Sequence, residues 1–276
     1  MHQILDILTR ASQIILLGVF VGAALGQSTP DDEPDIIAPA RPTVSNPAQF
    51  QRPGVLQLEV GYDGNFNARD SYHIQQDLPL ALRFAVSRRI LVEIDADSPY
   101  SLKDTSRLAE TGAGDTQFGI QGVLLTENKS RPGVALAYYI KAPTADENKG
   151  LGTGRVDHNF IGLVSKTSGK TTVDFNAIYL LAGNTSDRHH SSSGQAALAI
   201  TENITKRFGV QGEISGASRN DKQIGAVFGL GVATYQLNKR MVFDTGLRFG
   251  LTPFAPKVGA VVGVTFGIAN LYKKHH

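Results

Sequence analysis

The sequence predicts an all-β protein, a transmembrane antiparallel up-and-down β-barrel of about 12 strands. From Val55 onward apolar and polar residues alternate, and several of these runs reach about 9 to 12 residues. A tilted membrane strand needs about 9–11 residues, whereas strands of soluble proteins cluster near 5–6. Short turns also alternate with long loops, a pattern typical of outer-membrane barrels. Together these features favour a membrane barrel over a soluble sandwich.

The first 53 residues differ from the rest of the chain. Ile14 to Leu25 is an apolar run of 12 residues that ends in Ala24-Leu25-Gly26. It is too short to span a bilayer as a helix, and small residues at its end suit signal peptidase. Residues 1–26 are therefore expected to be a signal peptide cleaved near Gly26/Gln27. Residues 27–53, which hold six of the 12 prolines and an acidic cluster, are expected to be a periplasmic linker, because such composition buries little apolar surface.

The barrel is expected to occupy residues 54–272, and each strand is identified by an apolar face of period two. The first six faces are Leu56, Leu58, Val60 and Tyr62; Leu78, Leu80, Leu82, Phe84 and Val86; Ile90, Val92, Ile94 and Ala96; Phe118, Ile120 and Leu124; Val134, Leu136, Tyr138 and Ile140; and Val156, Phe160 and Val164. The last six are Val173, Phe175, Ala177, Tyr179 and Leu181; Ala196, Leu198 and Ile200; Phe208, Val210 and Ile214; Ile224, Ala226, Phe228, Leu230 and Val232; Met241, Phe243, Leu247 and Phe249; and Val258, Ala260, Val262, Val264, Phe266 and Ile268.

Charge supports placing these apolar faces against lipid. None of the positions on them is Asp, Glu, Lys or Arg, whereas the opposite register carries many charges. A lysine or arginine facing lipid costs about 2–4 kcal/mol at the bilayer midplane, while a charge facing a wet lumen costs little. An even number of strands would place both chain ends on the periplasmic side.

Composition and motifs exclude several function classes. The chain has no Cys, and a formal net charge of only +2 gives no reason to expect nucleic acid as a partner. Gly169-Lys170-Thr171 lacks the first glycine and the helix of a P-loop. His189-His190 and His275-His276 are expected to be a solvated loop and a tail. His158 and Ser165 are too far apart along one strand, about 23 Å, to form a hydrolase pair.

The candidate functional residues are charges expected to face the lumen. They are Arg83, Glu93, Asp95, Asp115, Asp174, Asp244 and Arg248. Two interpretations remain open for them: selection of solutes, or mutual pairing that braces the barrel and closes it. Glu93 and Asp95 share one strand face, and Arg83 on the preceding strand is a partner that would close the pore. No catalytic residue, metal site or cofactor is expected.

Several motifs resemble a known family. They are the stretch Thr111-Gly112-Ala113-Gly114-Asp115-Thr116, the stretch Lys141-Ala142-Pro143-Thr144 with the glycines that follow it, and Asp244-Thr245-Gly246-Leu247-Arg248-Phe249-Gly250. They are similar to the outer-membrane transporter family labelled putative MetA pathway of phenol degradation, over roughly residues 50 to 270. The resemblance implies a barrel that passes aromatic or hydrophobic compounds.

The sequence thus predicts an outer-membrane channel for passive passage of small solutes. Twelve strands lie between the eight that side chains can fill and the sixteen that leave an open channel. The expected partners are outer-membrane lipids, small solutes and the barrel-assembly machinery. The alternatives are a structural or adhesive barrel with a closed lumen, and an outer-membrane lipid-modifying enzyme.

Overall fold

The structure is a computed structural model that describes residues 37–66, 74–98, 100–102, 109–184, 189–218, 225–253 and 255–272. The predicted signal peptide and His275-His276 lie outside these residues. Among the residues described, no helix is long and apolar enough to cross a bilayer.

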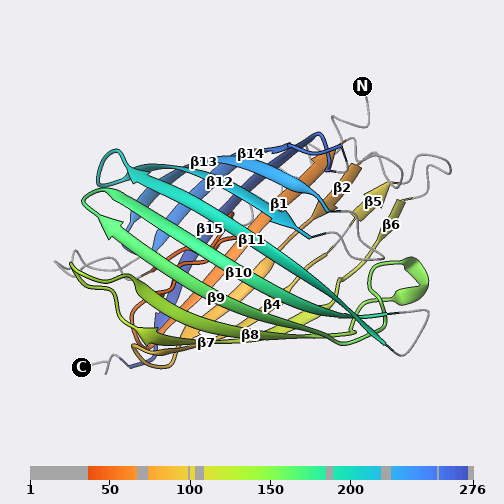
Figure 1. The fold of residues 1–276 in the computed structure, drawn as a ribbon, viewed down its shortest axis with the longest axis horizontal. Coiled ribbons are helices and arrows are strands. Elements are labelled where there is room, and N and C mark those ends of the chain that lie inside the picture. The colour runs from red at the N-terminus through yellow and green to blue at the C-terminus, as the bar shows by residue number, and fades with distance from the viewer. Residues whose placement is uncertain are drawn as a thin grey trace. The chain divides into compact units, whose positions relative to one another are not determined.

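Twelve antiparallel strands form a closed barrel (Figure 1), which confirms the predicted fold. In order around the wall they are β1 (Val55–Phe66), β3 (Leu80–Ala85), β4 (Ile90–Ala96), β7 (Thr116–Leu125), β8 (Gly133–Ala142), β9 (Asp157–Ser168), β10 (Thr171–Gly183), β11 (His190–Asn203), β12 (Phe208–Ala217), β13 (Val227–Asn238), β14 (Met241–Gly250) and β15 (Val258–Asn270). The last strand pairs with the first along its whole length, from Val55 opposite Asn270 to Phe66 opposite Val258. Closure leaves no unpaired edge in the wall.

Three short strands extend the sheet from the second half of β1. β2 (Ile74–Asp77) pairs with β1, β5 (Tyr100–Leu102) pairs with β2, and β6 (Ala109–Thr111) pairs with β5. A single 3-10 turn among the described residues, η1 (Glu147–Lys149), lies in the connection between β8 and β9. All of these elements belong to the long loops.

Short and long connections lie at opposite ends of the barrel. The β9–β10 connection is only Gly169-Lys170, and Gly169 has a φ of +62°, which glycine adopts without strain. The glycine and lysine that resemble part of a P-loop are therefore a hairpin turn. The connections that hold β2, β5, β6 and η1 lie at the other end. β1 begins and β15 ends at the short-turn end. Both ends of the barrel's chain therefore lie on the same side, as an even number of strands requires.

The two faces of the wall differ as the alternation predicts. Large apolar side chains of the predicted register are exposed on the outside, for example Ile120, Leu136, Phe175 and Leu247, whereas Gln57, Arg83, Asn176 and Asp244 on the opposite register are buried. Protein atoms therefore cover these inward side chains.

Strand β13 is the exception, and its predicted register was wrong. Leu230 and Val232 are 5% and 6% exposed and pack with Val261 inside the barrel, so the residues that share their face, Phe228 included, point inward. The outward register of this strand instead holds Gly229, Gly231 and Ala233. Both registers are uncharged here, so the rule that places apolar residues outside had no charge to decide between them.

Candidate functional site: the barrel lumen

Residues 37–53, here called the luminal segment, run along the inward-facing side chains of the barrel; Figure 1 draws this stretch in orange-red. Near its start, Ala38 exchanges two hydrogen bonds of 3.0 Å with the Gln57 side chain. The backbone N–H groups of Ala40 and Arg41 donate to the two oxygens of Glu59 at 3.0 and 3.1 Å. This first part of the luminal segment therefore forms its backbone hydrogen bonds with side chains of β1, and not with the backbone of a neighbouring strand.

The middle of the luminal segment is held from the opposite wall. Glu213 on β12 accepts hydrogen bonds from the backbone of Val44 and Ser45 at 3.1 and 2.7 Å, and from the Ser45 hydroxyl at 2.8 Å. Asn176 on β10 exchanges a pair of bonds with the Asn46 backbone, at 2.7 and 2.8 Å. Since β1 and β12 are well separated around the barrel, the segment crosses the lumen.

The later part of the segment contacts the strands that follow β3. Ala48 donates to Ser165 on β9, and Gln121 on β7 donates to the carbonyls of Pro47 and Ala48. Ala48 also packs in a buried apolar cluster with Ala135, Ala137, Tyr139 and Leu163. The amide of Gln51 donates to the carbonyl of Arg83 on β3. Strands on all sides of the barrel thus hold the segment.

Arg41 fixes the segment to the last strands. Its guanidinium pairs with Asp244 at 3.2 Å and donates to the carbonyl of Val262 at 3.2 Å. A Cβ on Gly61 would lie 2.1 Å from this guanidinium, and one on Gly263 would lie 2.3 Å from it. Glycine at both positions therefore makes room for the arginine.

These contacts differ from the expected linker. Residues 37–53 contain few large apolar side chains, but they order because buried acceptors of the wall satisfy their backbone N–H groups. The acceptors could be predicted from the sequence, since Glu59 and Glu213 lie on the charged register. Their hydrogen-bond donors could not be predicted, because they are backbone N–H groups, which could belong to any residue.

Two of the predicted site residues, Arg83 and Glu93, do come together. Arg83 is fully buried and bridges Glu59 at 3.1 Å and Glu93 at 3.3 Å. Its guanidinium also donates to the carbonyl of Ala38. The Tyr139 hydroxyl donates to Glu93 at 3.0 Å, and its ring crosses Gly119, where a Cβ would lie 2.2 Å from it. This cluster braces β1, β3, β4 and β8.

Two more predicted residues are paired near the long-loop end. Lys141 lies 2.8 Å from both Asp115 and Asp157, and Arg248 lies 2.7 Å from Asp63. In the short-turn half, Asp174 accepts from the Ser165 hydroxyl, and Asp244 pairs with Arg41 as described. The predicted residues thus divide among several separate pairs instead of forming one site.

Asp95 differs from the other predicted residues. Its Oδ1 is buried and has no hydrogen-bond partner among the described residues. Toward the loops lie Asp77, at the end of β2, and Asp97, just after β4. Burial, reinforced by the nearby charges of Asp63 and Asp97, raises the pKa of Asp77 to about 6. Among the described residues, the charges that face the lumen at the long-loop end are therefore mainly acidic.

Polar and aromatic side chains also gather on the outside of the wall, near the long-loop end. The Tyr138 hydroxyl and His158 Nδ1 are 2.8 Å apart, and the His158 and His190 ring centroids are 5.7 Å apart. His190 is thus part of β11, whereas the sequence analysis expected it in a solvated loop.

Ser165 is buried on the inward register and bonded to Asp174, so it cannot serve as the nucleophile partner of the outward-facing His158. Among the described residues, no three His, Cys, Asp or Glu side chains gather as metal ligands would.

Known structures share this fold. The COG4313 outer membrane channel from Pseudomonas putida F1 superposes with a TM-score of 0.64 and 14% identity, over 86% of this chain and 99% of that chain. The NanC porin gives a TM-score of 0.54 with 10% identity, and the KdgM porin 0.51 with 9%; each match covers 76% of this chain and 98% of the other. At these identities the likeness establishes the fold alone.

Sequence comparison gives the family. No curated protein matches the sequence significantly. The family model described as "Putative MetA-pathway of phenol degradation" matches residues 40–265 and so includes most of the luminal segment as well as nearly all of the barrel. This match confirms the resemblance drawn from the glycine-acid motifs, and the chain belongs to that family.

Proposed function

We propose that this protein is a passive outer-membrane channel for small solutes, with a pore narrowed by the luminal segment. The observation that carries the proposal is a closed twelve-strand barrel, exposed and apolar outside, with a buried polar lining crossed by residues 37–53. Outward apolar side chains suit a hydrocarbon environment, and a wet lumen tolerates the charges. A segment across the lumen limits passage to small molecules.

The proposed location is the outer membrane, reached after cleavage of a signal peptide near Gly26/Gln27. Support comes from the apolar run that ends in Ala24-Leu25-Gly26 and from the likeness of the barrel to outer-membrane channels and porins. In this arrangement the long loops face the exterior, whereas the short turns, the start of β1 and the end of β15 face the periplasm.

The proposed solutes are small cations or neutral molecules such as small aromatic compounds. Among the described residues, the charges that face the lumen at the long-loop end are mainly acidic: Asp63, Asp77, Asp95, Asp97, Asp115 and Asp157 against Lys141 and Arg248. In a lumen with low-dielectric walls, such an excess attracts cations and repels anions. The description of the family, which names phenol degradation, supports aromatic compounds.

Conductance across a planar bilayer tests the pore. The wild type should give a small conductance with cation preference at low salt, and the preference should fade as salt screens the charges. The double variant Glu213→Ala/Asp244→Ala removes two carboxylates that hold the luminal segment, so its conductance should rise. The matched control Asp115→Asn/Asp157→Asn removes two carboxylates around Lys141, so it should change selectivity without widening the pore.

A structural barrel with a closed lumen is the second candidate, and the buried Arg83 cluster together with the luminal segment favours it. Uptake of small aromatic solutes by liposomes that contain the refolded protein separates the two functions. Uptake above that of empty liposomes supports the channel. No conductance and no uptake, in the wild type and in the Glu213→Ala/Asp244→Ala variant, would establish the closed barrel.

A further inference from the structure

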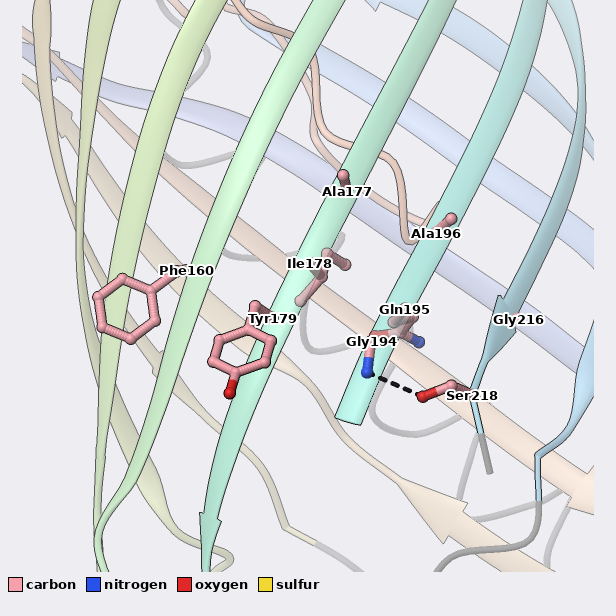
Figure 2. A pocket seen from close by; sticks show the side chains of 9 residues that line it. All are labelled: Phe160, Ala177, Ile178, Tyr179, Gly194, Gln195, Ala196, Gly216 and Ser218. Atoms are coloured by element: carbon pink, nitrogen blue, oxygen red, sulfur yellow. Dashed lines mark hydrogen bonds between the residues drawn. The ribbon is translucent and has the colours of Figure 1, made fainter. Parts of the chain in front are cut away.

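The outer wall has a hollow of about 510 Å³ across β9 to β12, near the long-loop end. Figure 2 shows the rings of Phe160 and Tyr179 standing at one side of it, with Gly194 and Ser218 at the other. Its volume falls within the range of about 300–1,000 Å³ that is usual for ligand sites. Nothing in the proposed solute path uses it.

Missing side chains create the hollow. Gly194 lies opposite Tyr179 in the ladder, and Gly216 lies opposite Ala196 one step farther from the loops. A Cβ on Gly194 would meet nothing nearer than the Ser218 hydroxyl, 3.8 Å away, so the position has room for a larger residue. Phe160 and Tyr179 are 47% and 50% exposed. The result is a shallow apolar trough with an aromatic side and a floor of small residues.

Hydrogen-bonding groups lie on the loop side of this trough. Phe160 is followed toward the loops, on the same outward register, by His158, which bonds the Tyr138 hydroxyl. His190 approaches His158 across the intervening strand, and the exposed Arg155 lies beside Gly183, the ladder partner of His190. Two imidazoles and a phenol therefore line a rim, and the Arg155 side chain begins beside it, at Gly183. These groups can donate hydrogen bonds to an anion.

From this arrangement we propose that the hollow binds one anionic lipid, with an acyl chain in the trough and the phosphate at the rim of His158, His190 and Arg155. The outward register faces hydrocarbon in a membrane barrel, so components of the bilayer reach the trough directly. The order of groups fits a lipid, because apolar residues lie toward the membrane centre and cationic or polar ones toward its surface. Tyrosine and arginine at that depth suit the same boundary.

The sequence allows a specific optical test, because it contains no Trp. A single Tyr179→Trp substitution places the only Trp of the chain beside the trough, and Phe249→Trp, at a residue of β14 that is 49% exposed, places it on a distant part of the wall. Each variant is refolded into vesicles that contain brominated phosphatidylglycerol or brominated phosphatidylcholine in varying proportion. Quenching of fluorescence then gives the relative affinity of the two lipids at each position.

The anionic lipid should bind about five-fold more strongly than phosphatidylcholine beside the trough, the ratio that one net hydrogen bond supplies, and equally at the control position. Adding Gly194→Leu should reduce the ratio to about one, whereas Gly231→Leu, an outward glycine with nothing within 4 Å of its Cβ, should leave it unchanged. His158→Ala with His190→Ala should also abolish the preference.

Equal affinities at both positions would overturn the proposal, as would a preference that survives Gly194→Leu. Phe160→Trp, on the other ring of the trough, serves as a second reporter if Tyr179→Trp does not fold. The readout does not involve conductance, so failure here leaves the proposed channel untouched, and a non-conducting barrel can still show the lipid preference.

Discussion

Replacing Arg83 with methionine tests whether buried ion pairs brace the barrel. Arg83 has no exposed surface and lies between Glu59 at 3.1 Å and Glu93 at 3.3 Å, both of which are also buried. Methionine fills a similar volume but leaves two carboxylates without their cation. Removing one partner of a buried ion pair costs about 3–5 kcal/mol, because the remaining charge stays desolvated.

The remaining contacts refine this magnitude. Glu59 keeps three donors after the change, the N–H groups of Ala40 and Arg41 and the amide of Gln57. Glu93 keeps the Tyr139 hydroxyl, and its other side-chain partner is a second acid, Asp95. The loss should therefore fall on Glu93 and lie near the lower end of the range, about 3 kcal/mol. Adding Glu93→Gln should recover much of it, because a neutral amide costs less to bury.

The assay is equilibrium unfolding in urea of the protein refolded in lipid vesicles, followed by heat-modifiable migration on gels. Arg83→Met should lower the free energy of unfolding by about 3 kcal/mol with an unchanged denaturant slope. The control is Arg89→Met, in the exposed β3–β4 turn, which should change it by less than about 0.5 kcal/mol. Equal stability of Arg83→Met and wild type, or no recovery on adding Glu93→Gln, would refute the bracing role.

Three further predictions follow from the wall, the luminal segment and the loop end. Phe175→Arg, on the lipid face, should cost about 2–4 kcal/mol in the same urea assay, whereas Phe228→Arg, on the inward register of β13, should cost less; the reverse order would restore the register predicted from the sequence. Gly263→Ala places a methyl group 2.3 Å from the Arg41 guanidinium, so it should destabilise the barrel by about 1–3 kcal/mol and raise conductance, and an unchanged conductance would show that Arg41 does not hold the pore narrow. Since the pKa of Asp77 is about 6, this carboxylate is charged above pH 6 and neutral below it, so cation preference measured by reversal potential should fall as pH drops through 6; Asp77→Asn should remove that step, and a step that persists would assign it to another group.

Much of the wall could be predicted because the outward register is determined locally. Leu136, Phe175 and Leu247 are exposed on the predicted face, and uncharged residues at such positions are required wherever a strand meets lipid. The pairing of Arg83 with Glu93 was also within reach, because neighbouring antiparallel strands place them directly opposite. In β13 both faces are uncharged, so the same rule failed for Leu230 and Val232.

The sequence by itself therefore determined the strand count, the barrel class and the charge of the inward register. These features depend on the alternation and the length of each strand, which are set within one strand or between neighbouring strands. Only the tertiary structure decided what fills the lumen. Arg41 pairs with Asp244 and Ser45 bonds to Glu213, contacts that span 203 and 168 residues of chain. The luminal segment offers mostly backbone groups to these acceptors, and every residue except proline carries the same backbone N–H donor. Their pairing becomes fixed only when closure of β1 on β15 brings the walls around the segment.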